Sequence, residues 1–273
     1  MQKEKYIHEE TMHNLEAPQQ IVPIIMALAQ PKSVVDMGCG VGTFLYCFKQ
    51  NGVNRVLGLD GPWANKELLN KYLTPDEFKE VDLEKPLQNI TEKFDLAVCL
   101  EVAEHLSESS ADTCVKNLTN LSDVILFSAA IPQQLGQNHI NEQWPAYWEA
   151  KFNAQGYEFH DVLRAPIWNN EKIWWWYRQN IFLVTRKGYQ LNTAPLASYP
   201  AAQSRSVVHP SIFKYHADVA TLSVSRLSLL ESGGYSIGTY FKLLVRAVLK
   251  KLGLQGKSNE MILIDTTDPL KKL

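Results

Sequence analysis

Short apolar segments alternate with amphipathic segments over the first two thirds of the chain. The apolar segments have the length of buried strands, and the segments between them repeat apolar residues at helical spacing. The predicted strands are residues 33–37, 54–60, 78–82, 94–100, 124–128, 157–163 and 175–185, and the predicted helices are residues 16–30, 43–51, 64–73, 109–119 and 143–155. This alternation predicts an α/β fold with a mostly parallel sheet, helices on both faces and an antiparallel last strand.

The pattern changes after residue 189. Residues 190–210 are rich in proline and small polar residues, which indicates an extended connector. Two further helices and a tail are predicted beyond it, at residues 211–231, at 236–252 and from 254. We therefore expect a sheet domain at residues 1–189, followed by a connector and helical C-terminal extension at 190–273.

The first two predicted strands each end near an acid, Asp36 and Asp60, and three glycines at alternate positions follow the first strand. Glycines let a backbone approach a ligand closely, and an acid at the tip of the second strand can bind both hydroxyls of a ribose. An acid two residues before the first glycine disfavours a phosphate and favours a sulfonium or ammonium group. The sequence therefore predicts a nucleoside ligand that carries a positive charge.

This pattern resembles motif I of the class I S-adenosylmethionine-dependent methyltransferases. The resemblance is carried by Asp36 to Gly42, Asp60-Gly61, residues 94–106, Asn138 to Pro145 and Trp174 to Asn180. It implies a Rossmann-like sheet of seven strands and S-adenosylmethionine as the methyl donor. The relatives that it suggests belong to bacterial glycan and secondary-metabolite pathways.

We expect four kinds of contact with the donor, to its amino-acid end, its ribose, its adenine and its sulfonium group. The glycine loop would hold its amino-acid end, Asp60 its ribose, and the tip of the fourth strand would lie under its methyl group. Trp63 either stacks on the adenine or anchors the next helix, and Asp82 either binds the adenine amino group or caps a turn. The expected donor-binding residues are Asp36, Gly38, Cys39, Gly40, Gly42, Asp60, Gly61, Trp63, Asp82, Leu83, Cys99, Leu100 and Glu101.

Residues 94–106 resemble motif IV of small-molecule methyltransferases, in which a strand ends in a Glu-x-x-Glu-His segment. Glu104 and His105 would then face the acceptor, although His105 would serve equally to cap or pack the following helix. His139 lies on a predicted loop at the mouth of the site, where it could contact the acceptor or abstract a proton. The expected catalytic residues are His139, His105 and Glu104.

Polar and aromatic residues gather around the predicted helix at 143–155 and before the last strand. Aromatic faces stack on sugars and planar acceptors, but they also fill interfaces between strands and helices. Asn141 and Glu142 could instead form the N-cap and first turn of the helix. The expected substrate-binding residues are Asn141, Glu142, Trp144, Trp148 and Arg178.

Composition and charge narrow the function classes. The chain has 273 residues, 45% of them hydrophobic, and a net charge of −2, which favours a globular protein that does not bind nucleic acid. Its four cysteines form no C-x-x-C pair, which is typical of reduced thiols in a cytoplasmic protein. We see no signal peptide and no segment long enough to span a bilayer. The histidines His8 and His13 are too far apart for a zinc helix, and we expect no metal.

The predicted helix at 236–252 has an apolar face, with Lys242, Arg246 and Lys250 recurring on another face. Such a helix packs on its own domain or across a dimer, associates weakly with an anionic membrane, or docks on a protein partner. Packing is the commonest of these roles.

These features together predict a methyltransferase that acts on an oxygen, rather than a nitrogen, of a polar small molecule such as a sugar or a secondary-metabolite intermediate. Two alternatives remain. Asp36 and the glycine spacing count against an NAD(P)-dependent oxidoreductase or epimerase, and the intact acids at the strand tips count against a non-catalytic nucleoside-binding module.

Overall fold

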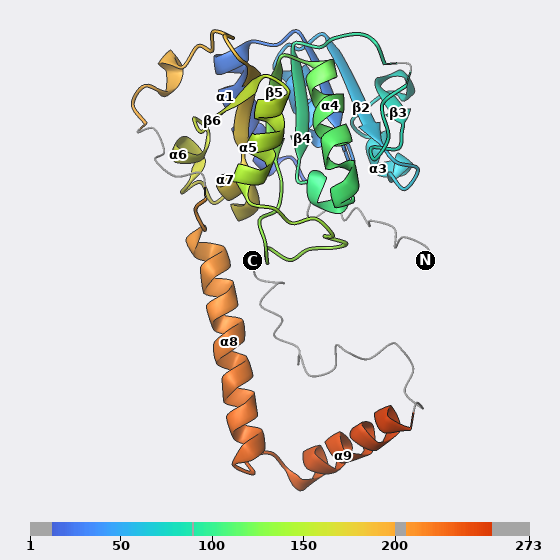
Figure 1. The fold of residues 1–273 in the computed structure, drawn as a ribbon, viewed down its shortest axis with the longest axis vertical. Helices are drawn as coiled ribbons and strands as arrows, with labels where there is room; N and C mark the ends of the chain where they lie inside the picture. The colour runs from blue at the N-terminus through green and yellow to red at the C-terminus, as the bar shows by residue number, and fades with distance from the viewer. Residues whose placement is uncertain (1–12, 89, 200–205, 253–273) are drawn as a thin grey trace. The chain divides into compact units, whose positions relative to one another are not determined.

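The computed structural model describes residues 13–88, 90–199 and 206–252 (Figure 1). The chain divides into two compact units, Met1–His209 and Pro210–Leu273. The tail predicted from residue 254 and His8 of the rejected zinc motif lie outside the described residues.

The first unit is built on one sheet of seven strands (Figure 1). In chain order the strands are β1 Ser33–Met37, β2 Arg55–Asp60, β3 Phe78–Glu80, β4 Leu96–Leu100, β5 Val124–Ser128, β6 Tyr157–His160 and β7 Phe182–Arg186. Their spatial order is β3-β2-β1-β4-β5-β7-β6, and all neighbours are parallel except β7, which is antiparallel to β5 and β6. The predicted mostly parallel α/β sheet of seven strands is confirmed.

Helices cover both faces of the sheet, as the alternating pattern predicts. They are α1 Glu16–Ala29, α2 Thr43–Gln50, α3 Lys66–Leu69, α4 Ala111–Leu121, α5 Pro145–Ala154, α6 Arg164–Ile167 and α7 Trp175–Asn180, with short 3-10 turns at Pro75–Glu77, Ala103–His105, Glu108–Ser110 and Ala194–Leu196. One core cluster joins α1 and α2 to the sheet, and a second joins α4 and α5 to it. The central strands β1 and β4 are buried throughout, which explains their continuous apolar sequence.

The prediction of one long strand at residues 175–185 is wrong in its first half. Residues Trp175–Asn180 form helix α7, and only Phe182–Arg186 pair in the sheet as β7. Aromatic residues favour strands, but tertiary contacts override that preference here. The helical turn directs Gln179 and Asn180 into the protein, where both amides are buried and hydrogen-bonded.

Several other element boundaries differ from the predicted ones, among them those of α3 and α5. The predicted helix at 64–73 is limited to α3 Lys66–Leu69, and Asn65 caps its start by accepting hydrogen bonds from the backbone N–H groups of Glu67 and Leu68. Helix α5 begins at Pro145, so Asn141 and Glu142 are not its N-cap and first turn. Proline is well suited to that first helical position because its fixed φ is already helical and its nitrogen needs no partner.

The second unit consists of α8 Pro210–Glu231 and α9 Ile237–Lys251. Gly233 adopts a φ of +75° between them, and the Tyr240 hydroxyl donates to the carbonyls of Leu229 and Leu230 at 3.0 and 2.8 Å. The turn between the helices is therefore fixed by specific contacts. Across the described residues, no helix combines the length and the apolar character that crossing a membrane requires.

Candidate functional site

The loops that follow β1, β2 and β4 meet at one edge of the sheet, because these neighbouring strands are parallel. The glycine loop after β1 has left-handed backbone at Gly38, Gly40 and Gly42. A Cβ on Gly38 would lie only 2.4 Å from a methyl carbon of Val102, which follows β4. The glycine loop is therefore packed directly against the segment that carries Glu101 and Glu104.

Asp60 ends β2 and holds the glycine loop. Its two carboxylate oxygens accept hydrogen bonds from the backbone N–H of Gly40 at 2.8 Å and of Gly61 at 2.7 Å, and the Trp63 side chain is a third donor. Burial raises the pKa of Asp60 to about 6, while these three donors oppose the rise. At neutral pH the carboxylate is mostly ionised, as the binding of two ribose hydroxyls requires.

Asp36 and Trp63 differ in their exposure. Asp36 is buried within β1, between Gly58 and Val98, and burial together with the charge of Asp60 raises its pKa well above the ordinary range. The Trp63 indole is 39% exposed and lies against Gly61, where an added Cβ would be 2.2 Å from its ring. Trp63 therefore flanks the position expected for the nucleoside.

Asp82 and Leu83 follow β3 and stand in a turn. An Asp82 oxygen accepts a hydrogen bond from the backbone N–H of Glu84 at 3.1 Å, and its carboxylate pairs with Lys85 at 3.0 Å. Leu83 is buried in the core cluster under α4 and α5. These contacts are the ones expected if Asp82 caps a turn.

Glu101 follows β4 in a left-handed conformation, with a φ of +54°. Its N–H donates to the backbone carbonyl and the hydroxyl of Ser128, both at 3.0 Å. Its carboxylate accepts hydrogen bonds from the side-chain amides of Gln134 at 2.7 Å and Asn180 at 3.1 Å. These contacts hold a strained residue in place at the strand tip.

Cys99 and Leu100 line the same strand tip from within. Both are buried, and Cys99 hydrogen-bonds to Cys114 of α4, which together with burial raises the pKa of its thiol. Burial likewise raises the pKa of Cys39 in the glycine loop, and it raises the pKa of Cys47 to about 11. All four cysteines are free thiols buried in the first unit.

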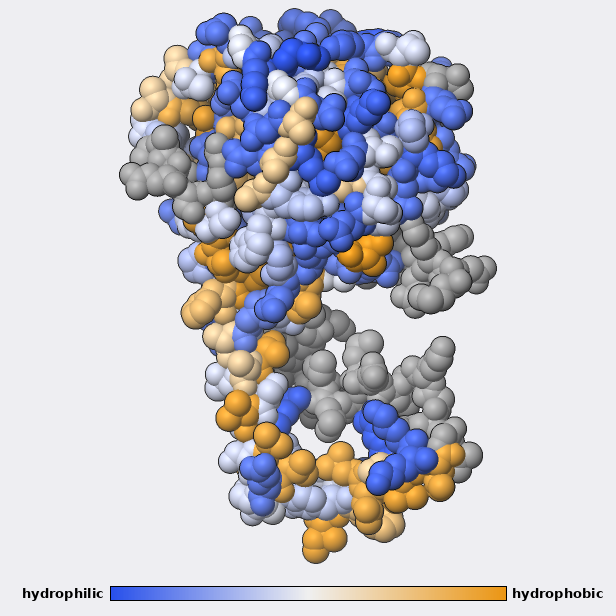
Figure 2. All heavy atoms as spheres, in the orientation of Figure 1, coloured by the Kyte–Doolittle hydropathy of each residue, from blue (hydrophilic) through white to orange (hydrophobic). Residues whose placement is uncertain are grey.

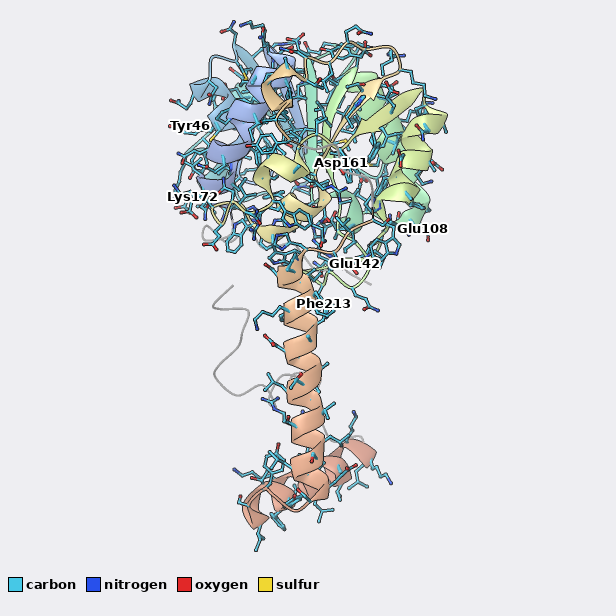
Figure 3. The ribbon with its side chains drawn as sticks, turned by 90° about the vertical axis from the view of Figure 1, so that its left-hand side faces the viewer. Tyr46, Glu108, Glu142, Asp161, Lys172 and Phe213 are labelled. Atoms are coloured by element: carbon cyan, nitrogen blue, oxygen red, sulfur yellow. The ribbon has the colours of Figure 1, made fainter. Side chains whose placement is uncertain are left out.

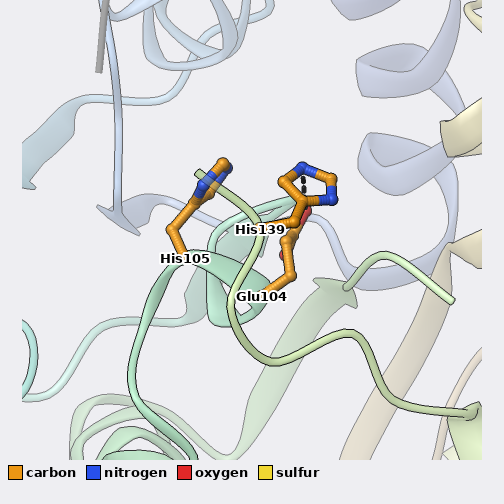
Figure 4. Close-up of side chains that lie close together, drawn as sticks. All are labelled: Glu104, His105 and His139. Atoms are coloured by element: carbon orange, nitrogen blue, oxygen red, sulfur yellow. Dashed lines mark ion pairs between the residues drawn. The ribbon is translucent and has the colours of Figure 1, made fainter. Parts of the chain in front are cut away.

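Glu104, His105 and His139 come together beside this edge (Figure 4). The rings of His105 and His139 meet edge to face, with their centroids 4.9 Å apart, and His139 Nε2 lies 4.0 Å from Glu104 Oε1. Glu104 is fully buried, and neither carboxylate oxygen has a hydrogen-bond partner of good geometry among the described residues. One ligand atom from each of the three residues lies within 4.8 Å of the others, so the cluster has the composition and spacing to hold a metal ion.

The pKa values of Glu104 and His105 are shifted in opposite directions. Burial and the carboxylates of Glu101 and Glu142 raise the pKa of Glu104 well above its ordinary range, although the N–H groups of Glu104 and Ala130 approach it. Burial lowers the pKa of His105 to about 4, with a further lowering by the charge of His139. At neutral pH, His105 is therefore an uncharged imidazole. The raised pKa makes Glu104 a weaker acid than an ordinary carboxyl group.

Glu142 positions His139. One carboxylate oxygen lies 2.9 Å from His139 Nδ1 and accepts a hydrogen bond from the backbone N–H of Leu135, while the other accepts from the N–H of Gln133 (Glu142 is labelled in Figure 3). Gln133 and Leu135 both have positive φ angles, so the loop is tightly turned around this carboxylate. With Nδ1 directed at Glu142, the other ring nitrogen of His139 points toward Glu104.

The remaining predicted acceptor residues are spread apart. Asn141 is buried next to the cluster, where its backbone N–H donates to the Glu104 carbonyl at 3.0 Å, and Trp144 is 41% exposed at the start of α5. Trp148 lies in the core, 5.5 Å from the Phe127 ring, and Arg178 donates to the Trp168 carbonyl at 3.2 Å. Asn141 and Trp144 thus adjoin the histidine loop, whereas Trp148 has the surroundings of a packing residue.

Sequence reasoning missed Gln134 and the function of Asn180 as supports of Glu101. The Asn180 amide donates to the Gln134 side-chain oxygen at 2.8 Å as well as to Glu101, so the three side chains form a closed network. A signal was present in Asn180, a polar residue at the end of an aromatic run and directly before a buried strand. Gln134 carries no such signal, because its position depends on the turned loop.

A separate cavity of about 330 Å³ lies at the opposite edge of the sheet, where the strands begin. Its lining includes Lys32, Asp95 and Asp123, which precede β1, β4 and β5. Asp95 is engaged in accepting hydrogen bonds from the backbone of Lys32 and Ser33. Ligands of parallel sheets bind at the carboxyl ends of strands, so the glycine-loop edge is the candidate for the functional site.

The sequence of this chain is similar to a known domain family and to known proteins. Residues 12–123 match the family model of a methyltransferase domain. The ubiquinone biosynthesis O-methyltransferase of Pasteurella multocida (strain Pm70) is 32% identical over 111 residues, which are 36% of this chain and 46% of that protein. The protein of the same name from Pseudomonas entomophila (strain L48) is 32% identical over 84 residues, which are 29% of this chain and 36% of that protein. The chain thus matches less than half the length of either relative.

One solved structure with a similar fold is that of DesVI from Streptomyces venezuelae. It is 13% identical to this chain, and the match covers 66% of this chain and 100% of that one with a TM-score of 0.48.

Proposed function

We propose that this chain is a class I S-adenosylmethionine-dependent methyltransferase that transfers the methyl group to an oxygen of a polar small molecule. The match of residues 12–123 to a methyltransferase domain supports this proposal. A sugar or a secondary-metabolite intermediate is the acceptor class we favour, with nitrogen as the less favoured acceptor atom. The relatives' name, O-methyltransferase, supports oxygen. The observation that carries the proposal is the adjacency, at one sheet edge, of the Asp60-bound glycine loop and the cluster of Glu104, His105 and His139.

Two features of the glycine-loop edge support S-adenosylmethionine as the methyl donor. The glycine loop leaves no room for a Cβ at Gly38, and the Asp60 carboxylate is ionised at neutral pH beside it. When bound, S-adenosylmethionine supplies an electrophilic methyl group. Asp60 would hold the ribose, Trp63 would cover the base, and the tip of β4 at Cys99 to Glu101 would lie beneath the sulfonium. Asp82 and Leu83 remain the proposed contacts of the adenine edge.

On the acceptor side, His139 is the proposed general base. Glu142 orients the ring through Nδ1, which leaves Nε2 to accept a proton from an acceptor hydroxyl. His105 is proposed to orient the acceptor as an uncharged imidazole, and the buried Glu104 to receive the proton from His139 or hydrogen-bond the acceptor. Asn141, Glu142, Trp144, Trp148 and Arg178 remain the proposed substrate-binding set, of which Asn141 and Trp144 have the most favourable positions.

Two variants separate donor binding from chemistry. We expect Asp60→Ala to weaken S-adenosylhomocysteine binding roughly 10- to 100-fold, since it loses charged hydrogen bonds, whereas the exposed Asp76→Ala control should bind normally. His139→Ala should bind the donor product normally and lose about 100-fold or more of its turnover. The assay is calorimetry for binding and labelled methyl transfer into candidate acceptors for turnover. Full turnover in His139→Ala would contradict the assignment of the base.

Fluorescence quenching and labelled methyl transfer test the alternative classes. An NAD(P)-dependent oxidoreductase or epimerase would show tryptophan fluorescence quenching by NAD rather than by S-adenosylhomocysteine. A non-catalytic nucleoside-binding module would bind S-adenosylhomocysteine but transfer no label to any acceptor pool.

A second chemical role for the histidine cluster is favoured by one observation, the two buried oxygens of Glu104 that lack a good partner among the described residues. With His105 and His139 they could hold a divalent cation, which would lower the pKa of an acceptor hydroxyl in place of a base. Methyl transfer measured with EDTA, and after adding back Mg²⁺ or Mn²⁺, distinguishes the two roles. Activity that survives EDTA supports the base.

The four buried free thiols support a cytoplasmic location as part of this proposal. The functional domain that we propose is residues 1–189, with residues 190–273 as the connector and helical extension.

A further inference from the structure

Helix α9 exposes a continuous apolar stripe. Successive residues turn by about 100° in an α-helix, which places these side chains within about 100° of arc on one side. They are Ile237, Phe241, Leu244, Val245 and Val248 of the helix and Leu252 at its C-cap, and their exposed fractions run from 41% for Val245 to 88% for Ile237. Figure 2 shows these hydrophobic residues gathered along α9. Single exposed hydrophobic residues are ordinary, but a contiguous stripe of this kind marks an interaction surface.

The opposite side of α9 is cationic. Lys242, Arg246 and Lys250 recur every fourth residue and lie across the helix from the apolar stripe, with Lys251 at its border. The sequence contains no Asp or Glu between Glu231 and Glu260. This segment therefore has a uniformly positive field in a chain whose net charge is −2.

The start of α9 is firmly built. The Ser236 side chain accepts a hydrogen bond from the Thr239 backbone N–H, which caps the helix. Tyr240 binds the end of α8 through its hydroxyl, and its ring contacts Tyr235 at a centroid distance of 6.1 Å. The helix is therefore held at its first turn, while residues 13–88, 90–199 and 206–252 leave its apolar stripe exposed.

The cationic side of α9 favours one of the partners that could cover the apolar stripe. A second copy of this chain or an apolar protein groove would cover the stripe, but would have no use for a cationic row on the far side. A helix that lies in the surface of an anionic bilayer uses both, because its apolar side enters the acyl region while Lys and Arg reach the headgroups. With 15 residues, α9 is shorter than the roughly 20 residues that a spanning helix needs.

We propose that α9 docks this protein on the surface of an anionic lipid bilayer, with the Ile237–Leu252 stripe buried among the acyl chains and Lys242, Arg246 and Lys250 at the headgroups. The partner is the lipid surface itself. The proposal concerns the second unit alone and stands whether or not the first unit methylates an oxygen.

The test uses the full chain and sedimentation with vesicles of phosphatidylcholine alone or mixed with phosphatidylglycerol. We expect binding only to the anionic vesicles, and release by added salt. The double variant Arg246→Gln/Lys250→Gln should bind roughly 25-fold more weakly, at about fivefold per basic side chain. The matched control Lys214→Gln/Arg226→Gln makes the same change in net charge on α8 and should bind like the parent chain.

A second matched pair tests the apolar stripe. Phe241→Ser should weaken vesicle binding roughly tenfold or more, because its ring is expected to enter the bilayer. Phe213→Ser, on an equally exposed phenylalanine of α8 (labelled in Figure 3), should leave binding unchanged. Circular dichroism and S-adenosylhomocysteine affinity show that each variant is folded.

Three results would overturn the proposal. The first is a parent chain that ignores anionic vesicles, and the second is an equal loss of binding in both members of either matched pair. The third is a dimer in sedimentation velocity that Phe241→Ser dissociates, in a protein without vesicle affinity. That outcome would assign the stripe to a second copy of the chain.

Discussion

Asp60 is the residue whose protonation bears most directly on donor binding. Burial raises its pKa to about 6, so it loses its charge as the pH falls through that value. A neutral carboxyl binds the two ribose hydroxyls less strongly than a carboxylate does. We therefore expect S-adenosylhomocysteine affinity to be roughly tenfold lower at pH 5 than at pH 7, as one proton per site predicts.

Calorimetric titration at several pH values measures this dependence. Asp60→Asn is the control, since it should bind weakly at every pH and lose most of the dependence. A parent chain with constant affinity from pH 5 to 7 would contradict the assignment of Asp60 as the ribose carboxylate.

Glu142 makes the contribution of orientation to catalysis measurable. It lies 2.9 Å from His139 Nδ1 and binds two backbone N–H groups of the loop. Glu142→Gln keeps the shape but no longer provides a charged acceptor for the ring, so we expect turnover to fall roughly 10- to 100-fold with little change in donor affinity. Glu149→Gln, in the neighbouring helix α5, serves as the control. If the loss appeared in donor affinity instead of turnover, Glu142 would be supporting the fold and not His139.

At the scale of elements, the packing of the glycine loop against the β4 segment can be tested with two glycines. Gly38 and Gly52 share a φ of +89°, but an added Cβ meets Val102 at 2.4 Å in the first and nothing within 4 Å in the second. Gly52→Ala should cost about 1 kcal/mol through its backbone conformation alone. Gly38→Ala should cost roughly 2 to 4 kcal/mol, because a steric clash is added.

Chemical denaturation of both variants gives the difference in the free energy of unfolding. Val102→Ala should recover part of the Gly38→Ala loss by making room for the new methyl group. Equal costs at the two glycines would show that the loop does not press on Val102.

The sequence predicted elements well where local pattern and tertiary packing agree. The strands predicted at 33–37 and 124–128 are the observed β1 and β5, because each is a buried apolar run between clear breaks. Residues 175–180 could not be predicted in this way. Their aromatic run favours a strand, and only distant partners of Gln179 and Asn180 make the helical turn the better solution.

The candidate site follows the same rule. Asp60 and the glycines were predictable, since the ends of neighbouring parallel strands must meet. The grouping of His139 with Glu104 depends on a loop in which Gln133 and Leu135 have left-handed backbone. Such conformations are set by tertiary contacts, here the hydrogen bonds to Glu142. Glutamine and leucine do not favour a left-handed backbone, so the residue types at these positions do not predict it.

At the scale of the whole molecule, the connector contributes to the first unit beyond residue 189. Leu191 and Leu196 pack against the core cluster of α1 and α2, and the His209 backbone N–H donates to the buried Gln179 side chain at 2.6 Å. A chain ending at 209 should therefore unfold at a temperature several degrees higher than a chain ending at 189. Both should be compared with the full chain by differential scanning fluorimetry.

The same truncations separate the functions of the two units. The chain ending at 209 keeps every proposed donor contact and should bind S-adenosylhomocysteine like the full chain, while losing vesicle binding. If the chain ending at 189 were as stable as the longer one, the packing of Leu191 and Leu196 would be energetically unimportant.

The reactivity of the buried thiols can be used to measure local opening of the fold. Alkylating reagents attack the thiolate, and burial raises the pKa of Cys39, Cys47 and Cys99, so labelling in the folded state has to wait for a segment to open. Pulsed alkylation with mass spectrometry would thus measure the opening rate of the glycine loop at Cys39 and that of the sheet core at Cys99. A ligand that closes the loop should slow the labelling of Cys39 selectively, which would reveal donor occupancy without any knowledge of the acceptor.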